Sequence, residues 1–172
     1  MFLGSYDHAF IPTWTPHTFA YFFSDEEDFC ISWLPESGPG DVKVFNKAVP
    51  GKNYTISETL NFLKANNLKF INGGTFEITH EHFASALLQF KKLNSHDVSY
   101  KVLGVKRNTG HDSYHCVYAI SDIKVKPLMN NGVATTSKSM RKITKHFKQY
   151  LSKENVNHLH IAEILKKHGI EN

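Results

Sequence analysis

Apolar runs separated by short polar breaks fill the first third of the chain, a pattern typical of strands joined by tight turns. The runs Thr18–Phe23 and Phe29–Leu34 flank the polar stretch Ser24–Asp28, which predicts an antiparallel hairpin. Residues 42–45 predict a further short strand, which we expect Pro50-Gly51 to close.

The spacing of the apolar positions then changes to the helical period. Thr55, with Glu58 three residues later, forms a capping-box pattern that opens a helix to about residue 67. A second helix is predicted over about His80–Leu93, with Thr79 as its cap. The apolar positions expected to face the core are Ile56, Leu60 and Leu63 in the first helix and Phe83, Leu87 and Phe90 in the second.

Further strands and helices are predicted in the second half of the chain. Phe70-Ile71 and Ser99–Val105 have the pattern of strands, and Gly73-Gly74 indicates a bend between elements. A short apolar helix is predicted from Cys116, and two more helices over about 138–152 and 156–168. This order of elements predicts an α+β fold with a small antiparallel sheet packed against helices.

Composition and charge agree with one folded domain. The chain has 172 residues, of which 41% are hydrophobic and 21% charged, and this excludes an intrinsically disordered protein. The net charge is +4, and much of the basic excess lies late, at Lys138, Arg141, Lys142, Lys145, Lys148, Lys153, Lys166 and Lys167. No nucleic-acid-binding motif accompanies these residues, so we interpret them as a solvated helical face and expect no nucleic-acid partner.

The chain carries no sign of a membrane span or a disulfide framework. No stretch approaches the roughly 18 apolar residues that a transmembrane helix needs. Residues 1–5 have none of the features of a secretory signal, but a removed leader would leave the same sequence, so the compartment stays open. The chain has only two cysteines, Cys30 and Cys116, which is too few for a disulfide framework. Cys30 is expected to be buried and to pack like a small apolar residue.

Motifs for metals and cofactors are absent from the sequence, so we predict neither. His80 and His82 lie two apart on the predicted helix and face different sides, which argues against a zinc motif. His111 and His115 lie four apart but straddle the expected start of a helix. The chain also has no phosphate-binding loop and no Gly-x-Ser-x-Gly elbow, which argues against a serine hydrolase of the usual type.

One cysteine and one histidine carry the candidate chemistry. Cys116 stands at the predicted first turn of an apolar helix, where the helix dipole and unpaired backbone N–H groups favour a thiolate. His17 lies at the beginning of a predicted strand that is rich in aromatic residues. A thiol with a nearby imidazole base is the machinery of a thiol hydrolase or acyltransferase, but only tertiary folding can bring these two residues together.

A third group usually orients the imidazole of such a pair. If the hairpin turn centres on Asp25 and Glu26, position 17 faces position 34, and a bulge would move the partner by two residues. Ser32 and Glu36 are therefore the polar candidates, and we favour Ser32. Tyr6 is a candidate for lining the same cleft, with simple packing as the alternative.

Three short segments resemble a circularly permuted branch of the papain-like cysteine hydrolases. They are Pro16–Ala20, Ile31–Pro35 and His115–Ile120. The branch includes relatives of bacterial cell-wall endopeptidases and lecithin:retinol acyltransferase-like enzymes, and the segments are also similar to a bacterial group of unassigned activity. The chain departs from the pattern of that group at His115, where the pattern has Asn, and at Tyr118, where it has His.

This resemblance implies a permuted papain-like domain over residues 1–129, with residues 130–172 as a helical C-terminal extension of it. It also implies that Cys116 is the nucleophile and His17 the base of a thiol-dependent hydrolase or acyltransferase. The substrate would be a peptide, amide or lipid ester, and no cofactor would be needed. Two alternatives stay open: a non-catalytic binding domain on the same scaffold, and an interaction protein that uses its basic C-terminal helices.

Overall fold

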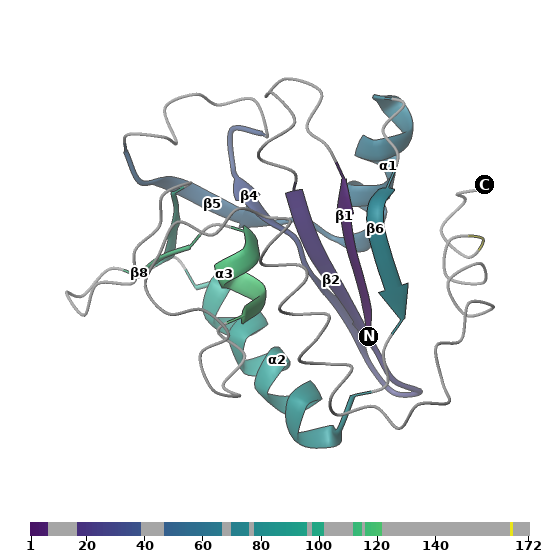
Figure 1. The fold of residues 1–172 in the computed structure, drawn as a ribbon. Helices are drawn as coiled ribbons and strands as arrows, with labels where there is room; N and C mark the ends of the chain where they lie inside the picture. The colour runs from purple at the N-terminus through teal and green to yellow at the C-terminus, as the bar shows by residue number, and fades with distance from the viewer. Residues whose placement is uncertain are drawn as a thin grey trace.

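The computed structural model describes residues 1–6, 17–38, 47–66, 70–75, 78–95, 98–101, 112–114, 116–121 and 166. The described residues form an α+β fold with two four-stranded sheets and helices packed against them (Figure 1). The α+β class predicted from the sequence is confirmed, with two sheets in place of one. The boundary expected near residue 129 lies outside the described residues, as do the terminal helices except Lys166, which is helical.

The first sheet is antiparallel throughout and has the strand order β3-β2-β1-β6. Its strands are β1 (Phe2–Tyr6), β2 (His17–Phe23), β3 (Asp28–Ile31) and β6 (Phe70–Thr75). The predicted hairpin is therefore confirmed as β2 and β3. The bend predicted at Gly73-Gly74 is wrong, because both glycines lie inside β6, where Gly73 pairs with Gly4.

The second sheet has the order β4-β5-β7-β8, and its last pair of strands is parallel. It consists of β4 (Trp33–Pro35), β5 (Val49–Asn53), β7 (Val98–Tyr100) and β8 (Asp112–Tyr114). The strand expected over residues 42–45 lies outside the described residues. Pro50-Gly51, expected to close that strand, lies within β5, so this expectation is wrong. The carbonyl of Pro50 accepts a hydrogen bond from the N–H of Glu36, at 2.9 Å.

Three helices pack on the sheets: α1 (Ile56–Ala65), α2 (His80–Leu93) and α3 (Cys116–Ser121). The capping box predicted for α1 is present, with Thr55 as N-cap and Glu58 bonding back to its N–H. Thr79 caps α2 as predicted. None of the helices among the described residues has both the length and the apolar character needed to cross a bilayer.

The buried face of α2 is shifted by one residue from the predicted face. Its fully buried residues are His82, Ala86, Gln89 and Leu93. The predicted positions Phe83, Leu87 and Phe90 are only partly buried and pack against the core from the side. Ala86 is small enough to let the helix approach the sheet closely, while the two phenylalanine rings flank it and contact Phe29, with ring centroids 5.3 and 5.1 Å apart.

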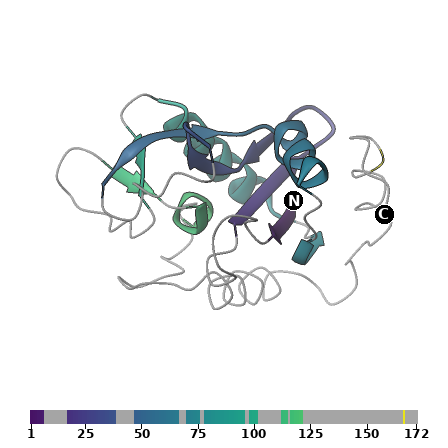
Figure 2. The same cartoon turned by 90° about the horizontal axis from the view of Figure 1, so that it is seen from above.

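The first sheet separates two apolar clusters. Because side chains alternate along a strand, Phe19 and Tyr21 face the cluster that contains α1, whereas Ala20 and Phe22 face the cluster that contains α2 and α3. Figure 2 shows α1 and α3 on opposite sides of β2. The described core is thus three layers deep, with β2 in the middle layer.

Gly51 illustrates how closely the second sheet is packed. The ring of the buried Trp33 lies directly over Gly51, so that an added Cβ would stand 2.6 Å from both Cε2 and Cη2 of the ring. We expect Gly51→Ala to lower the free energy of unfolding by about 1–3 kcal/mol, the usual cost of overpacking a core. Chemical denaturation monitored by circular dichroism measures this change.

A suitable control for this substitution is Gly38→Ala. Gly38 has a positive φ of 100° and open space around the position of an added Cβ. Alanine there introduces backbone strain without a clash, and we expect it to lower the free energy of unfolding by about 1–2 kcal/mol. Shrinking the ring in Gly51→Ala/Trp33→Phe should recover part of the loss, whereas Gly38→Ala/Trp33→Phe should not. Strictly additive effects of Gly51→Ala and Trp33→Phe would contradict the packing that we describe.

Candidate functional site

His17 and Ser32 meet in the interior at the start of β2. The Nε2 atom of His17 lies 3.1 Å from Oγ of Ser32, and the two residues are 1% and 0% exposed. Ser32, the favoured one of the two polar candidates, therefore contacts the histidine. Glu36, the other candidate, is exposed and follows β4.

Ser32 reaches His17 because the chain leaves the first sheet at this residue. The hairpin pairs Ala20 with Ile31, a register that would place residue 34 opposite residue 17. Ser32 ends this pairing, since the next three residues form β4 of the second sheet. The departure of the chain from the first sheet brings Ser32 to the beginning of β2.

The backbone of Ser32 is fixed on both sides by the end of β5. Its N–H donates to Oδ1 of Asn53 at 2.8 Å, and its carbonyl accepts from the N–H of Tyr54 at 3.0 Å. A residue held by two such bonds keeps its side chain in a defined place, which is what the support of an imidazole requires.

A second hydroxyl completes the group. Oγ1 of Thr59, a buried residue in α1, donates to Oγ of Ser32 at 2.9 Å. Ser32 therefore has one lone pair occupied by Thr59, and keeps a second lone pair and its own proton for His17. It can donate to an unprotonated Nε2 or accept from a protonated one.

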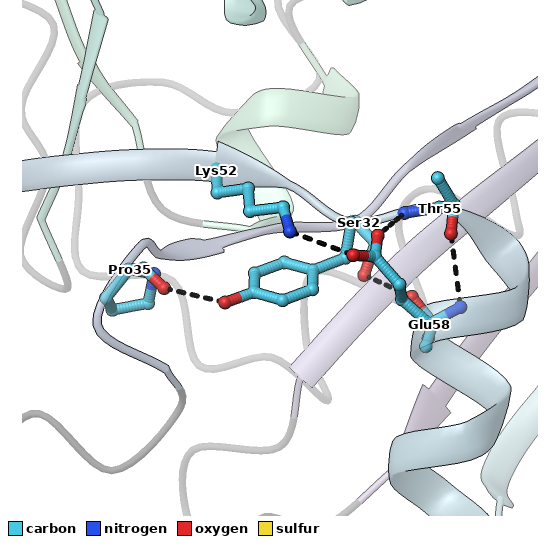
Figure 3. Close-up of polar contacts among 7 residues, drawn as sticks. Ser32, Pro35, Lys52, Thr55 and Glu58 are labelled. Atoms are coloured by element: carbon cyan, nitrogen blue, oxygen red, sulfur yellow. Dashed lines mark hydrogen bonds and ion pairs between the residues drawn. The ribbon is translucent and has the colours of Figure 1, made fainter.

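Ion pairing and capping hold the beginning of α1, next to this group of hydroxyls (Figure 3). Nζ of Lys52 lies 2.8 Å from Oε1 of Glu58. This bond, and then the hydrogen bond from the N–H of Thr55, hold the pKa of Glu58 below its usual range. The hydroxyl of Tyr54 donates to the carbonyl of Pro35 at 3.3 Å.

Cys116 is the first residue of α3, as the sequence predicted. It is 8% exposed and belongs to the apolar cluster beneath α2 and α3. α3 packs against β2, the strand that His17 begins. The register of the first sheet also places Tyr6 opposite His17.

His17 contacts Ser32 directly, and Cys116 is placed by its apolar cluster and by the packing of α3 against β2. Ser32 and Thr59 meet His17 on the α1 side of the first sheet, whereas the cluster that includes Cys116 lies on the other side. His17 is the first residue of β2.

Cys30 provides a contrast to Cys116. It is 4% exposed in the α1 cluster, and burial raises the pKa of its thiol far above the ordinary value. The neighbouring Tyr21 also has a raised pKa. Burial is the larger cause, and the hydrogen bond that the Tyr21 hydroxyl donates to Asp28, at 2.5 Å, is the next. The Cys30 thiol is thus held in its protonated, unreactive form.

Thr59 and Asn53 are two members of this group that sequence reasoning missed. Thr59 left a signal, since it stands at helical spacing within the apolar row Ile56, Leu60 and Leu63. A hydroxyl in such a row is buried and has to find a hydrogen-bond partner. No comparable signal marks Asn53, because a polar residue at a strand end is common.

Comparison with known proteins gives no relative for this chain: no family model, no curated protein and no solved structure matches it. Among the described residues, no three histidine, cysteine, aspartate or glutamate side chains are grouped so that they could hold a metal ion.

Proposed function

We propose that the protein is a thiol-dependent hydrolase or acyltransferase that acts on an amide or ester bond through Cys116 and His17. The observation that carries the proposal is the buried contact between His17 Nε2 and Ser32 Oγ, on a strand against which the cysteine helix packs. An imidazole with one nitrogen engaged by an orienting group acts through the other. Here the nitrogen for the thiol would be Nδ1.

The mechanism follows from these roles. The imidazole of His17 takes the thiol proton through Nδ1, and Sγ of Cys116 attacks the acyl carbon of the substrate. The bond to the leaving amine or alcohol breaks, the imidazolium returns the proton to this group, and a thioester remains on Cys116. His17 then takes a proton from water or from a second acceptor, whose oxygen or nitrogen attacks the thioester carbon. The C–S bond breaks, the acyl product leaves, and the imidazolium returns the proton to the Cys116 thiolate.

The fold that we propose for this chemistry is the permuted papain-like one, in which the histidine strand precedes the cysteine helix. Its support is the chain order of β2 and α3 together with their packing. The helical extension proposed for residues 130–172 completes the same domain, and Ser32 serves as the third site residue. The proposed substrate is a peptide, an amide or a lipid ester.

Selective alkylation tests the proposal. In the native protein we expect iodoacetamide at pH 7 to modify Cys116 several times faster than Cys30, because only the thiolate reacts and Cys30 is held protonated. Peptide mass mapping at increasing times measures the two rates in one sample, so that Cys30 is an internal control. If both cysteines react only after denaturation, Cys116 is a core residue and the hydrolase assignment is wrong.

A further inference from the structure

We propose that Thr59 is a second positioning residue of the site, which lets Ser32 accept the Nε2 proton of His17 and so leaves Nδ1 free to serve as the base. The inference rests on the proposed function and extends it to α1, a helix that contributes neither the nucleophile nor the base. Its basis is a chain of two hydrogen bonds. Nε2 of His17 lies 3.1 Å from Oγ of Ser32, and Oγ of Ser32 lies 2.9 Å from Oγ1 of Thr59.

The first step concerns burial. His17, Ser32 and Thr59 are 1%, 0% and 3% exposed, so water does not compete for their hydrogen bonds. In such surroundings an O–H without an acceptor is costly, and a bond to a charged group is stronger than a neutral one. The protonation of the imidazole therefore depends on what the two hydroxyls can accept and donate.

The second step concerns the direction of the two bonds. With Thr59 donating to Ser32, the proton of Ser32 is available for an unprotonated Nε2. That arrangement places the imidazole proton on Nδ1, which then cannot take a proton from the thiol. For Nδ1 to act as the base, Nε2 must carry the proton in the neutral imidazole as well as in the imidazolium. Ser32 must then accept this proton, and its own proton needs a new acceptor. Thr59 can be this acceptor, because a helical threonine can turn its own proton to the carbonyl four residues earlier, here that of Thr55.

The third step concerns the helix that holds Thr59. The N–H of Thr59 donates to the carbonyl of Thr55 at 2.9 Å, and Thr55 is the N-cap that the capping box with Glu58 fixes. The turn that carries the Thr59 hydroxyl is therefore tied down at its start. Reversal of the two hydroxyl bonds requires rotation of protons alone, with no movement of the backbone.

Thr59→Val tests this role, since valine keeps the branched shape and removes the hydroxyl. Without Thr59, the proton of Ser32 has no acceptor when His17 is an imidazolium. We therefore expect the protonation midpoint of His17 to fall by about half a pH unit to one pH unit. Imidazole NMR of a Cys116→Ala background measures this midpoint, and Thr59→Ser should restore it. Thr59→Ala replaces Thr59→Val if the valine variant does not fold.

Alkylation of Cys116 in the otherwise intact chain separates the failure of this inference from that of the proposed function. The inference is supported if Thr59→Val lowers the His17 midpoint and moves the pH profile of alkylation upwards, with Thr59→Ser close to wild type. It is overturned if Thr59→Val changes neither measurement while His17→Ala changes alkylation. If His17→Ala leaves alkylation unchanged, the proposed function fails, whatever Thr59→Val does to the imidazole.

Discussion

Cys116→Ala is expected to abolish acylation of the protein by 4-nitrophenyl acetate, an activated ester that replaces the unidentified substrate. In the proposed mechanism Sγ of Cys116 attacks the carbonyl carbon, an acetyl thioester forms and 4-nitrophenolate leaves. Removal of the sulfur leaves only slow reactions at surface amines. We expect the initial release of 4-nitrophenolate to fall by at least about 10³-fold, as is usual when a nucleophile is lost.

Mass spectrometry and a matched cysteine variant make this experiment specific. The wild-type chain should gain one acetyl group, on the peptide that contains residue 116. Cys30→Ala removes the other, unreactive thiol and should retain both the acetylation and the rapid release. Equal release from wild type and Cys116→Ala, or acetylation that maps to lysine, would show that Cys116 is not a nucleophile.

His17→Ala is expected to slow the alkylation of Cys116 at pH 6 by about ten- to thirtyfold. An ordinary thiol, with a pKa of about 8.5, is only about 0.3% ionised at this pH. An imidazolium partner can raise this fraction several hundredfold, and the weaker nucleophilicity of a stabilised thiolate lowers the gain by about tenfold. The rate of iodoacetamide incorporation between pH 5 and pH 9 measures the effect.

The sign of the pH dependence also discriminates. Because loss of the imidazolium destabilises the thiolate, the alkylation profile of His17→Ala should lie at higher pH than that of wild type, and the two rates should converge above about pH 9. His82→Ala is the matched control, since His82 is also a buried histidine and lies in α2. Identical profiles for wild type and His17→Ala would mean that the two residues form no ion pair.

The sequence predicted the local elements well where their signals are local. Thr55 and Glu58 satisfy each other within one helical turn, so the beginning of α1 could be predicted without knowledge of the fold. The same holds for Thr79 at α2 and for the polar turn of the β2–β3 hairpin, whose register followed from the position of the turn. Elements of this kind depend on residues that are neighbours in the chain.

Predictions were wrong where a distant partner decides the structure. Pro50-Gly51 and Gly73-Gly74 have the composition of turns but lie in strands, because the cross-strand neighbours supply pairing that their own propensities oppose. The ring of Trp33 fills the space that a side chain at residue 51 would need, and Gly73 pairs with Gly4. Neither partner is visible from the residues around the glycines.

For the candidate site, three features could be predicted from residues close in the chain: the strand that His17 begins, the helix that Cys116 begins, and Ser32 and Glu36 as the polar candidates for the third residue. Only the tertiary structure decided that the chain leaves the first sheet at Ser32, that Asn53 and Thr59 hold this residue, and that α1 and α3 lie on opposite sides of β2. The difference lies in how far apart the interacting residues are in the chain, because capping and turn formation depend on hydrogen bonds between residues only a few positions apart. A buried hydroxyl, in contrast, obtains its partner from whichever element the packing of the core brings to it.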